Sequence, residues 1–343
     1  MKTKINSIIV TLLLVCLLGS NSLAQDKQKL AQSGFQFLSV VSDAQGAAMA
    51  EAMTSLQTGS NALFFNPAGM AEMSTLIDAT ASINQWIADI RHTTFSLAVS
   101  PAQGNYGVIG FSLQSVDYGD FYGTQVDQTT PLGYKDMGIF NLKALAVGLG
   151  YAKQLTDRFS VGGQVRWVQQ DLGSSMIPLI GQLDEISGLD TTQVKKSNKL
   201  SPYVFDFGTQ FKTGIKSLVF GMSVRNFSKE VKYVEEGFQA PLVFSLGLSM
   251  NMFDLMKELP MDQALYMSVD ACHHRDHPEQ VKIGFEYKAL QLLALRGGYV
   301  SNNDETGFSY GVGISHFGFT FDYAYTPFGI FDKVHRMTVR FSR

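Results

Sequence analysis

The fold follows from a stretch in which apolar and polar residues alternate: Val281-Lys282-Ile283-Gly284-Phe285-Glu286-Tyr287-Lys288. Successive side chains of a β-strand point to opposite faces, so one face of this stretch is apolar and the other carries the charges. A charge that faces lipid at mid-membrane costs about 2–4 kcal/mol, whereas a wet lumen tolerates it. The stretch therefore predicts a membrane strand whose odd-numbered residues face lipid and whose even-numbered residues face a lumen.

The same alternation recurs along most of the chain, for example from Phe159 to Trp167 and from His335 to Phe341. A tilted strand needs about nine to eleven residues to cross the hydrocarbon layer. The pattern predicts an all-β fold, a transmembrane antiparallel β-barrel of about 14 strands within residues 76–343. The predicted strands are 76–86, 91–100, 105–117, 141–154, 158–170, 201–212, 217–227, 241–252, 264–274, 280–288, 291–300, 307–315, 317–325 and 334–342.

A soluble β-sandwich or a water-soluble barrel also alternates with period two. Aromatic residues near strand ends favour the membrane barrel, because they match interfacial girdles: Trp86, Trp167, Tyr203 and Tyr287. Tight turns also alternate with longer polar connections at 118–140, 171–200, 228–240 and 326–333. Short periplasmic turns and long outer loops are typical of outer-membrane barrels. The connection 253–263 is long on the short-turn side, where we expect a small amphipathic helix.

The first 24 residues read as a signal peptide. Lys2 and Lys4 precede an apolar run from Ile8 to Leu18, and Ser22-Leu23-Ala24 offers a small-x-small cleavage site. An uncleaved anchor helix and a lipoprotein signal at Cys16 are the alternatives. We therefore predict cleavage near Ala24 and a location in the cell outer membrane. The net charge of −3 comes without a basic patch, so we expect no nucleic-acid partner.

Residues 25–70 do not alternate, and residues 25–75 read as a plug inside the barrel lumen. Residues 43–53 are rich in Ala and Met and suggest a short helix or a small-residue turn. The motif Asn66, Pro67, Ala68, Gly69 follows, where the proline lacks a donor and the glycine permits unusual backbone angles. Phe64, Phe65 and Met70 flank it and are our candidates for contact with an apolar ligand.

The Asn-Pro-Ala segment before the first strand resembles the plug of the FadL-like fatty-acid transporter superfamily, whose barrels have fourteen strands. Within it, the chain is most similar to the PorV/PorQ family, which is linked to type IX protein secretion. The resemblance is carried by short motifs in a common order: Phe35-Gln36-Phe37-Leu38, Asp43-Ala44-Gln45-Gly46-Ala47-Ala48-Met49, Asn66-Pro67-Ala68-Gly69, Phe285-Glu286-Tyr287, Leu295-Arg296-Gly297-Gly298-Tyr299 and Phe321-Asp322-Tyr323-Ala324-Tyr325.

That resemblance implies one of two functions. The first is a non-enzymatic component of secretion or surface attachment, with outer-membrane lipid, a translocon or sortase, and exported cargo proteins as partners. The second is transport of a hydrophobic small molecule, which passes the plug and leaves sideways into the membrane. A transporter should have a continuous apolar pocket against Phe64, Phe65 and Met70 and a gap in its wall. A secretion component should have a closed lumen and a loop surface for a partner. A purely structural barrel is a third possibility.

No motif in the sequence points to an enzyme or a cofactor, and we predict neither. Cys272-His273-His274-Arg275-Asp276-His277 contains metal-ligand types, but neighbours in a strand point to opposite faces, so a polar turn is favoured and no metal is predicted. Charged residues expected on lumen faces would pin the plug, line a path or only solvate the lumen: Asp206, Asp270, Asp322, Arg166, Arg225, Glu286, Arg296, Arg336 and Arg340.

Overall fold

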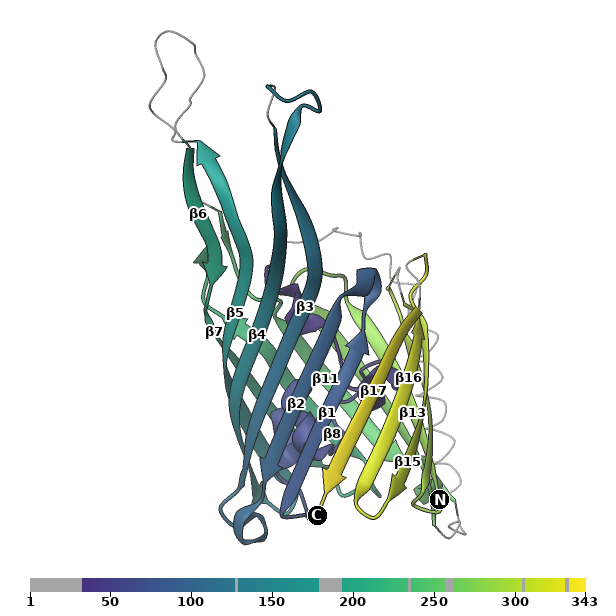
Figure 1. Ribbon diagram of the computed structural model, residues 1–343. Helices are drawn as coiled ribbons and strands as arrows, with labels where there is room; N and C mark the ends of the chain where they lie inside the picture. Colours follow the sequence, from purple (N-terminus) through teal and green to yellow (C-terminus); the bar gives the residue numbers. More distant parts are fainter. Residues whose placement is uncertain are drawn as a thin grey trace.

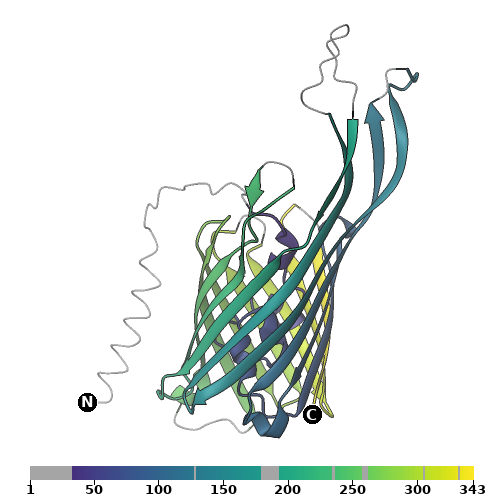
Figure 2. The same ribbon diagram turned by 90° about the vertical axis from the view of Figure 1, so that its left-hand side faces the viewer.

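The computed structural model describes residues 33–126, 129–178, 193–233, 236–256, 262–303, 306–330 and 333–343. They form a β-barrel with a short, irregular segment inside it (Figures 1 and 2). The predicted signal peptide, its cleavage near Ala24 and the first residues of the predicted plug lie outside the described residues. Within the described part of the chain, no helix has the length and apolar character needed to cross a membrane.

Fourteen of the strands in the described part of the chain close the wall, and each pairs antiparallel with its neighbours. The circle closes because β1 pairs with β17 and β4 pairs with β5. The wall strands are β1 (Ile77–Gln85), β2 (Arg91–Val99), β3 (Val108–Val126), β4 (Tyr134–Thr156), β5 (Phe159–Pro178), β7 (Tyr203–Lys212), β8 (Val219–Ser228), β11 (Val243–Asn251), β12 (Gln263–His274), β13 (Gln280–Ala289), β14 (Leu293–Val300), β15 (Phe308–His316), β16 (Phe319–Pro327) and β17 (Lys333–Ser342).

Side chains alternate across the wall as predicted. In β13, Lys282 and Glu286 are buried on the lumen side, whereas Phe285 is 44% exposed on the outer side. In β17, Arg336 and Thr338 are buried and Met337 is exposed. The predicted fold class is confirmed, because the register that buries one set of side chains exposes the other.

Two connections that the sequence suggested as polar loops are paired strands instead. β3 and β4 continue as one ribbon to the pair Val126–Tyr134, and β5 pairs with β6 (Gln193–Leu200) up to Pro178. Both ribbons rise well clear of the barrel (Figures 1 and 2). The expectation of loops at 118–140 and 171–200 was therefore wrong over these strands: a hairpin satisfies its backbone hydrogen bonds without an apolar face to reveal it. We call this end of the barrel the ribbon end and the opposite end the short-turn end.

Shorter elements complete the described chain. The segment inside the barrel holds η1 (Gln36–Ser39), α2 (Ala44–Ala48), η2 (Gly59–Phe64) and η3 (Pro67–Met70). Three 3₁₀ turns occupy connections: η4 (Ile87–Asp89), η5 (Pro101–Gly104) and η6 (Met252–Leu255), the last where a small helix was expected. A hairpin of β9 (Val231–Lys232) and β10 (Gly237–Phe238) lies over the ribbon end.

Candidate functional site

The internal segment, residues 33–75, runs from the ribbon end to the short-turn end. Ser33 bridges to Gln239 beside the β9–β10 hairpin, and the chain leaves the lumen where Ile77 pairs with Arg343. Between these points its helices pack against different parts of the wall, so the segment spirals down the lumen and fills it as a plug (Figure 2). Its N-terminal boundary at residue 25 stays a prediction.

The motif at 66–69 anchors the lower part of the plug. Asn66 is buried and caps η3, accepting a hydrogen bond from the backbone N–H of Ala68 at 3.1 Å. Its amide nitrogen donates to the carbonyls of Thr54, at 2.7 Å, and of Thr209 in β7, at 3.1 Å. One side chain therefore ties a helix cap, another turn of the plug and the wall together.

Pairs of glycines in the wall receive the plug. Each pair lies across two neighbouring strands in register and faces the lumen, where an added Cβ would come closer than 3 Å to plug atoms. The pairs and the plug residues they meet are Gly110–Gly150 with Leu63 and Met70, Gly162–Gly208 with Asn66 to Ala68, Gly221–Gly247 with Thr54, and Gly284–Gly298 with Met49 and Ala50. The plug is thus seated in recesses that only glycine leaves open.

The predicted ligand contacts are packed closely. Phe65 and Met70 are buried, and Gly46 lies directly against the Phe65 ring. Phe64 and Phe65 border a cavity of about 20 Å³, whose wall includes Arg225, a donor to the Phe64 carbonyl at 2.5 Å. A hydrocarbon does not fit in that space. Contact of these residues with a ligand stays a prediction.

The two sides of the lumen differ in chemistry. Along β3, β4, β5 and β7, small and apolar wall residues pack against Phe35, Phe37 and Leu38 near the ribbon end and against Leu63 and Met70 below. Along β13, β14, β16 and β17 the wall is charged. One side of the lumen is therefore packed mainly through apolar contacts, and the other is lined by charged residues.

Ion pairs organise the charged side. Arg296 donates to Glu286 at 2.7 Å and to Asp322 at 2.6 Å, and Arg340 pairs with Asp78 at 2.7 Å. Gln45 of α2 donates to Glu286 at 3.0 Å. The predicted lumen residues are thus brought together as a network that also holds the plug.

Three more of the predicted lumen residues, Arg166, Asp206 and Asp270, form hydrogen bonds elsewhere in the lumen. Arg166 donates to Asp206 at 2.8 Å, and Asp270 accepts from the backbone N–H of Thr54 in the plug at 2.9 Å. Asp206 also accepts from the backbone N–H of Asn226, at 2.7 Å, where β7 and β8 fall out of register. These contacts fix the wall and the plug on the side of β5, β7, β8 and β12.

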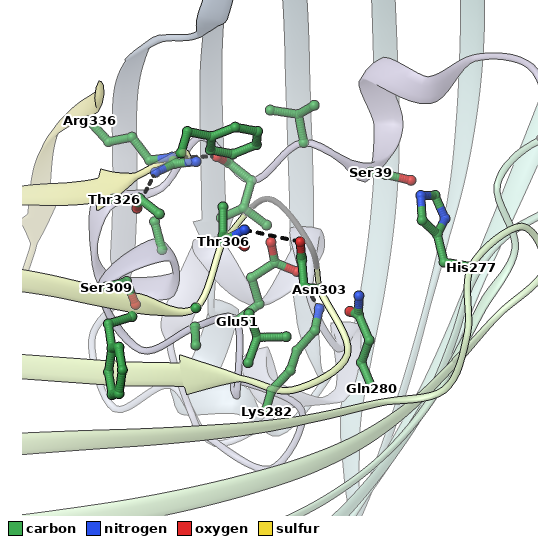
Figure 3. A pocket seen from close by; sticks show the side chains of 18 of the residues that line it. Ser39, Glu51, His277, Gln280, Lys282, Asn303, Thr306, Ser309, Thr326 and Arg336 are labelled. Atoms are coloured by element: carbon green, nitrogen blue, oxygen red, sulfur yellow. Dashed lines mark hydrogen bonds and ion pairs between the residues drawn. The ribbon is translucent and has the colours of Figure 1, made fainter. Parts of the chain in front are cut away.

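A chamber of about 260 Å³ lies at the ribbon end of the charged side; we call it the upper chamber. Figure 3 shows Glu51 of the plug reaching toward Lys282 of β13, and their carboxylate oxygen and ammonium nitrogen are 2.6 Å apart. Arg336 donates to the carbonyl of Val41 at 2.9 Å and to Thr326 at 2.8 Å. The chamber is lined by both polar and apolar side chains.

Sequence reasoning missed part of this chamber. Glu51 and Lys282 pair only because the plug brings residue 51 beside β13; the lumen-facing position of Lys282 was the one signal available. Trp86 was assigned to a lipid-facing girdle, which is wrong: its ring packs at 4.7 Å from Phe328, lies under the Arg336 guanidinium and lines the chamber. It sits in a turn, where strand alternation does not decide orientation.

Two plug carboxyl groups border cavities: Glu51 lines the upper chamber, and Asp43 borders the small cavity beside Phe64 and Phe65. Burial raises the pKa of Asp43 to about 6, although its side chain caps α2 by accepting from the Gly46 N–H at 2.6 Å. For Glu51, burial works in the opposite direction, but the Lys282 ammonium prevails and holds the pKa below its ordinary value. Glu51 therefore stays charged in its pair, and Asp43 carries a costly charge at neutral pH.

A second chamber of about 400 Å³, the lower chamber, lies at the short-turn end of the same side. Gln45 from α2, Lys288, Arg296, Asp322 and Arg340 are among its lining residues. The helix α2 therefore lies between the two chambers.

The wall beside the upper chamber is incompletely paired. β15 and β16 pair only as far as Tyr310–Tyr325, although both strands continue toward the ribbon end. Ser309 and Thr326, the next residues in that register, both line the chamber. Pro327, which follows, has no N–H to continue the ladder. Phe308, which is 57% exposed, is also among the residues that line the chamber.

The Cys272–His277 stretch divides between lumen and turn. Cys272 is buried beside Ser245, while His273 points outward and approaches Glu279 at 3.0 Å. Asp276 accepts hydrogen bonds from Ser33 and, at 2.6 Å, from Gln36. Burial would raise its pKa, but these bonds and His277 lower it to about 2. Among the described residues, no group of three or more His, Cys, Asp or Glu could hold a metal ion.

Solved structures of outer-membrane proteins share this architecture. The toluene transporter TbuX of Ralstonia pickettii is 12% identical, with 87% of this chain and 97% of that chain covered and a TM-score of 0.58. The toluene transporter TodX of Pseudomonas putida is 14% identical, covering 92% and 98%, with a TM-score of 0.56. A FadL homologue of Pseudomonas aeruginosa is 12% identical, covering 88% and 98%, with a TM-score of 0.55.

The barrel has the FadL-like fold. At these identities the likeness extends to the fold alone. No family model matches the sequence, and no curated protein is similar to it. Two of these neighbours are named as toluene transporters.

Proposed function

We propose that this FadL-like barrel is an outer-membrane transporter that takes up a small, mainly apolar molecule from the outside. The observation that carries the proposal is the upper chamber, which is bounded below by the plug and bordered by unpaired ends of β15 and β16. A ligand that enters from the ribbon end meets a seated plug. Its open way out is sideways, into the bilayer.

The chemistry of the chamber suits such a route. Val41, Trp86 and Phe308 offer apolar surface, and burying apolar surface contributes roughly 25 cal/mol for each Å² removed from water. Gln280 and Ser309 offer hydrogen bonds that orient a ligand. The plug packs into the glycine recesses of the wall, so moving it would cost free energy. A lateral path for the ligand avoids that cost, because the plug stays in place.

The test links the unpaired ends of β15 and β16 by a disulfide. Cysteines introduced as Ser309→Cys and Thr326→Cys, in a Cys272→Ser background, should form a disulfide across β15 and β16. Uptake of toluene or a fluorescent apolar probe into proteoliposomes should be lost when oxidised and return on reduction. Each single-cysteine variant is the matched control. Equal uptake in the oxidised and reduced protein would refute the lateral route.

A second candidate is favoured by the ribbons, which expose large apolar side chains beyond the barrel. Tyr122 is 78%, Val126 80% and Leu132 74% exposed. Such a surface suits a protein partner, as expected of a PorV/PorQ-like component of type IX secretion with a translocon, sortase or cargo. Removing residues 120–139 should then abolish co-purification of the partner and leave apolar uptake unchanged, whereas loss of uptake alone would favour the transporter.

A further inference from the structure

We infer that the lumen holds a second route, for small hydrophilic solutes, which α2 closes between the upper and lower chambers. The two chambers lie on the same side of the plug, one toward each end of the barrel. α2 contributes to both: Ala47 lines the upper chamber and Gln45 the lower. This helix of five residues is therefore the plug element that borders both chambers.

Charged residues line both chambers along this route. Lys288, Arg296 and Asp322 line the lower chamber, and Lys282 and Arg336 line the upper. In the lower chamber an apolar molecule loses its driving force against these charges, whereas a polar solute exchanges its water for hydrogen bonds. Most of these charges are paired, so the route should favour neutral or zwitterionic solutes of about the size of an amino acid or a monosaccharide.

The seat of α2 is suited to displacement. Its contacts with the wall include three hydrogen bonds: Ala44 N–H to Thr338 at 2.9 Å, Gln45 to Glu286 at 3.0 Å, and Ser309 to the Ala48 carbonyl at 3.0 Å. On the side of the wall α2 packs against small residues, since Ala48 meets Gly311 and Ala324.

Strain just after α2 opposes this seat. Ala50 and Glu51 follow the helix with φ of 50° and 64°, a left-handed conformation that costs energy for residues other than glycine. Moving α2 aside relieves this strain and joins the chambers, while the apolar side of the plug stays seated.

The experiment places one cysteine on each side of the partition. Ala47→Cys and Gln45→Cys are made separately in full-length Cys272→Ser protein in a planar bilayer. A membrane-impermeant methanethiosulfonate ammonium reagent is added to one compartment at a time. Each cysteine should react from both compartments, at least tenfold faster from its own side. Modification should reduce glycine or glucose flux by more than half. Ala146→Cys, buried in the apolar side, is the matched control and should stay unmodified.

Strictly one-sided labelling, or a solute flux no greater than that of protein-free bilayers, would overturn the inference. Its failure is separable from that of the proposed function. In the Ser309→Cys/Thr326→Cys protein, oxidation should stop apolar uptake and leave hydrophilic flux equal to that of the reduced form, since both forms lack the Ser309 hydroxyl. Labelling at position 45, in the lower chamber, should reduce hydrophilic flux and leave apolar uptake unchanged.

Discussion

A single added methyl group should unseat the lower plug. In Gly208→Ala, the new Cβ would lie 1.8 Å from Oδ1 of Asn66, and the Asn66 side chain must leave its recess. Three hydrogen bonds depend on that side chain: those to the carbonyls of Thr54 and Thr209 and the one from the Ala68 N–H. At about 1 kcal/mol for each bond, the seated plug should lose about 3 kcal/mol relative to the unseated one. The unseated population should then rise on the order of a hundredfold.

The neighbouring glycine provides the control. Gly163 faces outward, and a Cβ there would approach protein atoms no closer than 3.4 Å, so Gly163→Ala should behave like the wild type. The assays are release of a small trapped solute from proteoliposomes and the rate of proteolysis within the plug. Gly208→Ala should show faster solute release and faster proteolysis than the wild type. If it matches Gly163→Ala and the wild type in both assays, the glycine recesses do not hold the plug.

Three further outcomes follow from the same contacts. Deletion of residues 66–69 should loosen the plug and raise small-solute leakage, and unchanged permeability would count against the plug. Glu51→Gln should lower the free energy of unfolding by about 1–3 kcal/mol, because it leaves the buried Lys282 ammonium without its counter-charge, whereas Glu279→Gln, in an exposed pair, should change thermal stability little. Burial raises the pKa of Asp43 from 3.8 to about 6, so the folded state holds this proton more tightly than the unfolded state. The Asp43 contribution to stability should therefore fall by about 3 kcal/mol as pH rises from about 4 to about 6, and Asp43→Asn should flatten that slope in thermal unfolding.

The sequence alone determined the barrel. Period-two alternation in stretches such as Val281 to Lys288 depends only on adjacent residues, so it reveals the strands, their lumen faces and the fourteen-strand wall without knowledge of their partners. The break in that alternation before residue 76, with Asn66 and Pro67 in it, likewise marked the plug. The sequence did not predict the β3–β4 and β5–β6 ribbons beyond the wall. Strands that pair outside a core need no regular alternation of apolar and polar residues, so the sequence carries little sign of them.

The tertiary structure decided what fills the lumen. Gly162 and Gly208 are 46 positions apart, and only the register of β5 against β7 makes them one recess for Asn66. Glu51 meets Lys282 because the plug passes β13 on its way down the lumen. Trp86 lines the upper chamber because it lies in a turn, where the alternation of a strand does not fix which way a side chain points. Recesses, ion pairs and chambers arise from the alignment of distant segments, and that alignment is set by packing of the whole barrel around its plug.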